Sequence, residues 1–162
     1  MPPLLIEACV ETLAAARRAE AAGCDRIELC VSLHEGGVTP SAGLIAACAE
    51  QLSIPVHVLV RPRAGDFVYD AHDLDVMFRD IAVAKVAGAA GVVIGVLTPD
   101  DAIDIARVRE LVHAAQPLVV GFHRAFDRVH DQVAAVPALI EAGVSIVLTS
   151  GGASTARAGA AR

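Results

Sequence analysis

D-R-I-E-L-C-V-S-L-H-E-G-G-V-T-P-S, residues 25–41, is the stretch of the chain that decides the fold. It predicts a strand, a loop and the start of a helix. Aliphatic residues alternate with Glu28 and Cys30, so the carboxyl and the thiol share one face of the strand. The glycine pair at 36–37 ends the strand, and Thr-Pro-Ser at 39–41 supplies a helix cap and a first-turn proline. A carboxylate and a thiol beside a glycine loop indicate a functional site.

The same sequence of elements recurs along the chain. Expected strands are 4–10, 26–31, 55–60, 91–97, 118–123 and 145–149, and expected helices are 12–23, 41–51, 72–87, 104–115 and 131–142. Most of these strands are continuous apolar runs, which is typical of a parallel sheet covered on both faces. The alternation predicts about six β/α units, in either a barrel or a doubly wound sheet.

The positions of the polar residues favour the barrel. They follow the strands, and nearly every strand contributes some, which fits the mouth of a (β/α) barrel better than a single crevice. No G-x-G-x-x-G motif follows the first strand, which argues against a dinucleotide-binding fold. We therefore predict one α/β domain over residues 1–162, an incomplete TIM (β/α)8-type barrel.

Composition excludes several classes of protein. The chain has 162 residues, 55% of them hydrophobic and only 3% aromatic, with a net charge of −6. Few aromatic side chains and an acidic balance argue against nucleic-acid binding. No apolar run is long enough to span a membrane, and Glu7 interrupts the N-terminal apolar residues too early for a secretory signal. Four cysteines without a C-x-x-C spacing argue against a disulfide scaffold, so a cytoplasmic protein is expected.

Several longer motifs resemble those of one family. They are E-A-C-V, D-R-I-E-L-C, E-G-G-V-T-P-S, P-V-H-V-L-V-R-P-R-A-G-D-F-V-Y, G-V-V-I-G-V-L-T, F-H-R-A-F-D and L-T-S-G-G, in this order over residues 4–152. In these motifs the chain is similar to the CutC family of copper homeostasis proteins. The resemblance implies a TIM barrel and copper, as Cu(I), as the bound metal.

The length departs from that family pattern. A full barrel has eight strands and usually needs about 250 residues, whereas six strands are expected here. We interpret the chain as a fragment or a truncated product lacking strands seven and eight, with a phosphate or anion site lost with them. The first and sixth strands would then have unpaired edges, which promote association.

Cys9 and Cys30 are the candidate metal ligands. Each follows a glutamate by two residues, and they match the family's E-x-C motifs. Thiolates are soft ligands that select Cu(I). The alternative is that both are small buried apolar residues, as free cysteines often are. Cys24 and Cys48 are interpreted as packing residues.

A second set of polar residues suggests acid–base chemistry and anion binding. The candidate catalytic residues are Glu7, Glu28, Arg61, His123 and Asp127. Buried carboxylates need a partner, and Arg61 or His57 is expected to serve; the alternative is a structural ion network. The candidate anion-binding residues are Arg61, Arg63, Arg124, Gly36, Gly37, Gly151 and Gly152. The alternative for Arg124 is a simple ion pair with Asp127, and Asp66 is expected to orient Arg61 or Arg63.

Three functions remain open from the sequence. The first is a cytosolic copper homeostasis protein that binds Cu(I) through its strand-end cysteines. The second is a TIM-barrel enzyme acting on a small anionic or phosphorylated substrate at the C-terminal barrel face. The third is a non-functional remnant. Expected partners are a copper ion and a small anionic ligand, with neither nucleic acid nor membrane, and a homo-oligomer is expected.

Overall fold

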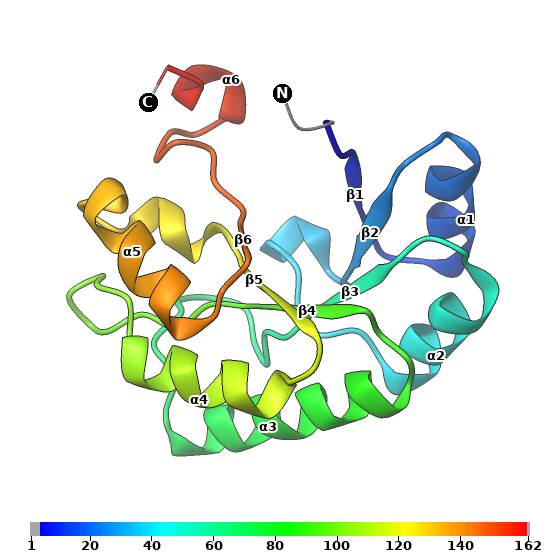
Figure 1. Ribbon diagram of the computed structural model, residues 1–162, viewed down its shortest axis with the longest axis horizontal. Coiled ribbons are helices and arrows are strands. Elements are labelled where there is room, and N and C mark those ends of the chain that lie inside the picture. Colours follow the sequence, from blue (N-terminus) through cyan, green and yellow to red (C-terminus); the bar gives the residue numbers. More distant parts are fainter. Residues whose placement is uncertain (1–3, 162) are drawn as a thin grey trace.

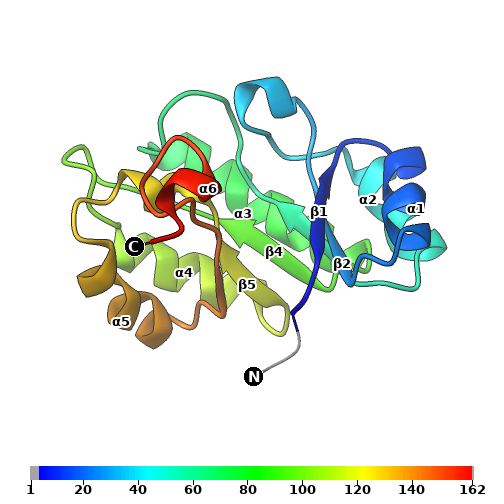
Figure 2. The ribbon, with the colours of Figure 1, turned by 90° about the horizontal axis from the view of Figure 1, so that it is seen from above.

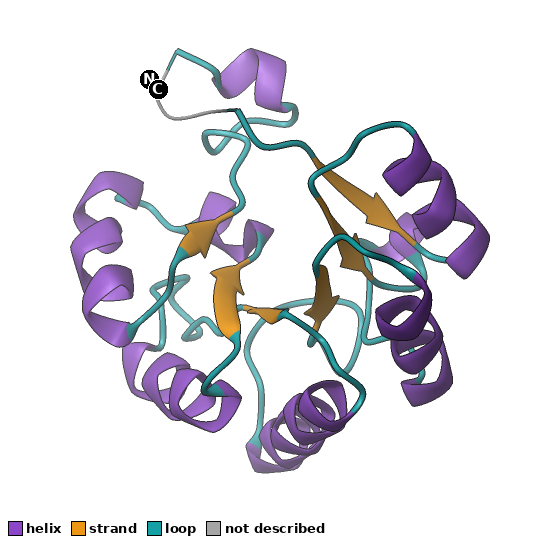
Figure 3. Ribbon diagram, turned by 45° about the vertical axis from the view of Figure 1, so that its right-hand side comes forward, coloured by secondary structure: helices purple, strands orange, loops and turns teal. Residues whose placement is uncertain are grey.

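A six-stranded parallel sheet curls into an open barrel with helices on its outside (Figure 3). The computed structural model describes residues 4–161. The strands are β1 (Glu7–Val10), β2 (Arg26–Leu29), β3 (Val56–Leu59), β4 (Gly91–Ile94), β5 (Val119–Phe122) and β6 (Ile146–Val147). They pair in sequence order, so the predicted incomplete TIM-type barrel is confirmed.

Six α-helices and two short 3-10 helices connect or follow the strands (Figure 1). The α-helices are α1 (Leu13–Ala21), α2 (Ala42–Gln51), α3 (Ala71–Val86), α4 (Ile105–Ala115), α5 (Gln132–Ala142) and α6 (Ala156–Gly159); the 3-10 helices are η1 (Leu33–Glu35) and η2 (Arg124–Arg128). Side chains cap the helices as the sequence predicts. Thr12 accepts from the N–H of Ala15, and Ser41 accepts from that of Leu44.

Two separate apolar clusters stabilise the sheet. The larger one lies between the sheet and the helices and includes Ile27, Val58 and Leu111. The smaller one consists of Cys30, Leu59 and Val93 on the inner face of the barrel. Because side chains alternate along a strand, Glu28, His57 and Arg61, which are two residues from Cys30 or Leu59, also point inward and belong to the candidate site.

The first and last strands are shorter than the sequence predicts. β1 begins at Glu7 rather than residue 4, and β6 covers two residues where five were expected. Within residues 4–161 each of these strands has one neighbour, so fewer ladder hydrogen bonds fix its ends. The opening between β1 and β6 is visible in Figures 2 and 3. Among the same residues no helix is long and apolar enough to cross a membrane.

Candidate site on the inner face of the barrel

The thiols of Cys9 and Cys30 meet inside the barrel. Their Sγ atoms lie 3.5 Å apart, with Cys30 buried and Cys9 exposed at the edge of the sheet. The Cys9 Sγ also lies 3.8 Å from Glu28 Oε1. The hydrogen bond with Cys30, aided by burial and the Glu28 carboxyl, raises the pKa of Cys9, and the same bond lowers that of Cys30. The two candidate ligands are therefore in contact, and their role as ligands stays a prediction.

The register of β1 and β2 corrects the expected arrangement of the glutamates. Cys9 lies opposite Glu28, and Glu7 lies opposite Arg26, so the two E-x-C motifs are staggered by two residues. Glu7 forms its ion pair with Arg26 instead of the expected Arg61 or His57. Glu7 is also the first residue of β1 rather than a mid-strand residue. Glu7 and Glu28 therefore do not lie side by side, although the Glu7 charge still reaches Glu28.

Glu28 lies between a thiol and an imidazole. Its neighbour in the register on β3 is His57, whose ring packs over Gly91 of β4. Burial, with a smaller contribution from Glu7, raises the pKa of Glu28 to about 7. Burial and Arg26 lower the pKa of His57. A carboxyl with a pKa of about 7 suits acid–base chemistry. Within residues 4–161 no cluster of three or more His, Cys, Asp or Glu could hold a metal ion.

Arg61 connects two loops at the carboxyl ends of the strands. Its Nη1 donates to the carbonyls of Glu35 (3.0 Å) and Gly37 (2.7 Å), and its Nη2 donates to that of Gly65 (2.9 Å). The guanidinium packs 5.0 Å from the centre of the Phe67 ring and is buried. These bonds tie the loop after β2 to the loop after β3.

His123 follows β5 and is buried beside Arg61. Its Nδ1 accepts the N–H of Ala125 at 3.1 Å, and its ring lies over Gly95, where a Cβ atom would collide with it. The ring centre of Phe67 is 4.9 Å away. Burial and the Arg61 charge lower the pKa of His123 to about 3, so the ring is neutral at physiological pH.

Asp127 occupies the position where the sequence predicts an anion. Its carboxylate accepts from Thr149 Oγ1 at 2.6 Å and from the N–H groups of Ser150 and Gly152 at 2.9 and 3.1 Å. Arg124 donates to it at 2.9 Å. Burial would raise the pKa of Asp127, but these hydrogen bonds outweigh it and hold the pKa well below its usual range.

The other predicted anion-binding groups are also engaged within the chain. Arg63 pairs with Asp66 and Asp73, so Asp66 does orient Arg63. The N–H groups of Gly36 and Gly37 donate to carbonyls of their own turn, and that of Gly151 donates to Thr149 Oγ1. The structure thus places these residues at one end of the barrel, and their binding of an external anion stays a prediction.

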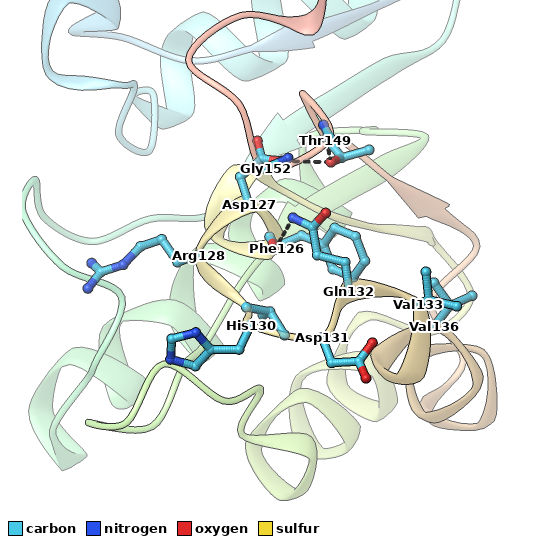
Figure 4. Close-up of a pocket in the computed structure, with 12 residues that line it drawn as sticks. Phe126, Asp127, Arg128, His130, Asp131, Gln132, Val133, Val136, Thr149 and Gly152 are labelled. Atoms are coloured by element: carbon cyan, nitrogen blue, oxygen red, sulfur yellow. Dashed lines mark hydrogen bonds between the residues drawn. The ribbon is translucent and has the colours of Figure 1, made fainter. Parts of the chain in front are cut away.

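Two cavities open at this end of the barrel. One, of about 570 Å³, is lined by Cys9, Glu28, Leu33, Glu35, Gly36, Leu59, Arg61, Phe67, His123, Arg124, Asp127, Arg128 and Leu148. The other, of about 640 Å³, is built mainly from η2 and the start of α5 (Figure 4). Asp127 and Arg128 belong to both walls. Of the candidate metal and catalytic residues, the first cavity is lined by Cys9, Glu28, Arg61, His123 and Asp127, while Cys30 and Glu7 lie outside its wall.

Gly91 and Gly95 were missed as site residues from the sequence. Each leaves the space that a histidine ring from a neighbouring strand fills, His57 over Gly91 and His123 over Gly95. The available signal was their spacing of four, which puts both on the inner face of a strand that is otherwise aliphatic.

The six parallel strands, the outer helices and the polar residues at the carboxyl ends of the strands place the chain in the class of TIM-type (β/α) barrel proteins. Within that class, the chain belongs to the CutC family, whose model matches residues 4–162.

Individual relatives agree with this assignment. The chain is 48% identical over 155 residues to the human copper homeostasis protein cutC homolog, and 50% identical over 147 residues to a CutC family protein of Mesorhizobium japonicum. These matches cover 96% and 91% of the chain but 57% of each relative, so the chain spans less than two thirds of their length.

Solved structures show the same fold. A crystal structure of CutC from Streptococcus agalactiae matches with a TM-score of 0.88 and 35% identity, over 94% of this chain and 75% of that one. Phosphoenolpyruvate phosphomutase from Streptomyces platensis matches with a TM-score of 0.66 at 17% identity, over 92% and 60%. The second likeness concerns the barrel fold alone.

Proposed function

We propose that the chain takes part in copper homeostasis and binds Cu(I) through Cys9 and Cys30. The observation that carries the proposal is the 3.5 Å separation of the two Sγ atoms from neighbouring strands. The names of the human and Streptococcus relatives support the copper assignment. Thiolates are soft ligands suited to Cu(I). In this proposal Cu(I) is the ion that the protein handles, and it is not a resident cofactor.

The protonation of the pair suits reversible binding. Thiolates bind metal, so loading the ion releases protons. The hydrogen bond from Cys9 lowers the pKa of Cys30, which makes Cys30 the first thiolate to form. The chemistry requires reduced cysteines, so our proposal also places the protein in the cytoplasm.

Anaerobic Cu(I) titration against a competing chelator tests the proposal. We expect Cys9→Ser and Cys30→Ser each to weaken Cu(I) affinity by more than about 100-fold, the most that loss of an outer-shell partner costs. Cys24→Ser is the matched control, because Cys24 lies in the turn before β2 outside both cavity walls. Unchanged Cu(I) affinity in both site variants would reject the proposal.

An enzyme acting on a small anionic substrate is the second candidate. It is favoured by Glu28, a carboxyl with a pKa of about 7 in a cavity that three arginines also line. Glu28→Gln should lower turnover by about 100-fold or more if Glu28 transfers a proton. Incubation with a panel of phosphorylated and carboxylated metabolites, followed by NMR, measures turnover, and no conversion of any compound would reject this candidate.

A further inference from the structure

Arg61 is a buried cation without a carboxylate partner. Its residue is 4% exposed, and among residues 4–161 no acidic side chain forms an ion pair with it. Three of its five N–H donors reach backbone carbonyls. Neutral carbonyls solvate the charge without cancelling it, and a buried charge of this kind attracts a counter-ion.

The donors that remain on Arg61 have a specific geometry. Its Nε is buried and has no hydrogen-bond partner within residues 4–161, and one Nη2–H takes no part in the three bonds above; the buried Tyr69 hydroxyl lies beside the guanidinium. Nε and Nη2 are neighbouring nitrogens of one guanidinium edge. Two parallel N–H groups on such an edge match the two oxygens of a carboxylate.

His123 adds a neutral donor beside this edge. Because the Ala125 N–H donates to Nδ1, the neutral ring carries its proton on Nε2. In the described part of the chain Nε2 is buried without a partner. Both Arg61 and His123 pack against Phe67, at 5.0 and 4.9 Å from its ring centre, and both line the 570 Å³ cavity.

We propose that Arg61 and His123 together bind a small organic carboxylate, with the carboxylate on the Arg61 edge and a neighbouring oxygen on His123 Nε2–H. Arg124 and Arg128 also line the cavity but pair with Asp127 and Asp101, so Arg61 supplies the charge that a monoanion balances, whereas a phosphate dianion would leave one charge uncompensated. Phe67, Leu59 and Leu148 supply apolar wall for a short carbon chain. His123 acts as a hydrogen-bond donor rather than as a base.

This inference names the ligand class of the second candidate function and is independent of copper binding. Pyruvate is the probe for a carboxylate, and inorganic phosphate is the comparison ligand for a phosphate-binding site. Two-dimensional ¹⁵N–¹H spectra of the histidine side chains should show His123 protonated on Nε2, with its signal shifting as pyruvate is added. A proton on Nδ1, or no shift at saturating pyruvate, would overturn the proposal.

Calorimetry on variants supplies the second measurement. We expect His123→Phe, which keeps a ring and removes the donor, to weaken pyruvate binding at least tenfold. His123→Gln keeps a neutral N–H and should lose less than threefold. His130→Gln is the control, because His130 is exposed and lies outside this cavity. Equal pyruvate affinity in wild type and His123→Phe, or tighter binding of phosphate than of pyruvate, would refute the site as described. Pyruvate binding without turnover of any metabolite would support the carboxylate site and reject the proposed enzymatic function.

Discussion

Two buried histidine side chains couple the stability of the barrel to pH. The pKa of His123 falls from 6.5 to about 3 through burial and Arg61, and that of His57 is also lowered. Below pH 6.5 the unfolded chain binds a proton that folded His123 does not, so the folded state loses stability as pH falls toward 3. Glu28 acts oppositely, because its pKa rises from 4.5 to about 7. Its carboxyl favours the folded state as pH falls through that range.

Replacing His123 should therefore change the slope of stability with pH. We expect the free-energy difference between wild type and His123→Gln to change by about 1.4 kcal/mol per pH unit between pH 6 and pH 4. Urea unfolding at a series of pH values measures it. His130→Gln, at an exposed position, should leave the slope unchanged. Parallel curves for wild type and His123→Gln would show that His123 does not stay neutral in the folded state.

Gly95 allows the close packing of the His123 ring to be tested by adding a single Cβ atom. A Cβ there would overlap the His123 ring, so Gly95→Ala should force the ring to move and cost about 1–3 kcal/mol of unfolding free energy. Gly121→Ala is the matched control on the next strand, because its Cβ would meet Val93 at an ordinary 3.5 Å. Thermal and urea unfolding compare the two variants. Equal stability of Gly95→Ala and Gly121→Ala would contradict the close approach.

At the level of elements, Asp127 joins η2 to the loop that follows β6. One carboxylate gathers Thr149, Ser150, Gly152 and Arg124, residues that come from both segments. Since the pKa of Asp127 is held low, this connection persists in moderately acidic solution.

Removing the charge on Asp127 should release that loop. Asp127→Asn replaces one acceptor oxygen by a donor, and we expect a loss of about 2–3 kcal/mol with faster hydrogen exchange at the Ser150 and Gly152 amides. Asp131→Asn is the control, because asparagine still caps the start of α5. Hydrogen exchange followed by NMR measures both. Unchanged protection at Ser150 and Gly152 would contradict the role of Asp127.

On the scale of the whole molecule, the sheet of the barrel has two open edges. Within residues 4–161, β1 and β6 each have a free side. Beside β1, Leu4, Leu5 and Ile6 are 88%, 60% and 53% exposed. Exposed strand edges flanked by apolar side chains favour association.

We therefore predict that the 162-residue chain self-associates through these edges. Leu5→Glu places a charge at the β1 edge and should shift the chain toward monomer by sedimentation equilibrium. Val86→Glu is the control, because Val86 is 91% exposed at the end of α3, away from both edges. A wild-type chain that stays monomeric at high concentration, or equal effects of the two variants, would refute edge association.

Sequence patterns predicted the architecture well and the site partly. Continuous apolar strands with regular helices between them led to the open barrel, and strand alternation placed Glu28 and Cys30 on one face. Register was not predictable, because parallel strands carry no turn that fixes it, and so the pairing of Glu7 with Arg26 was missed. The Arg124–Asp127 pair was foreseeable because its residues lie three apart.

The two glycines in and just after β4 affect which amino-acid substitutions the barrel can accept. Gly91 and Gly95 are four residues apart and so lie on the same face. The space beside each one is filled by a histidine ring from the neighbouring segment. On the inner wall, a glycine on one segment thus leaves the space that a large side chain on the neighbouring segment fills. In a library that replaces every residue singly, every side chain placed at Gly91 or Gly95 should lower stability, while Val92 and Ile94, packed outward against helices, accept other aliphatic residues. Tolerance to substitution would then be lowest at two inner positions four residues apart and would depend on apolar character at the outer ones.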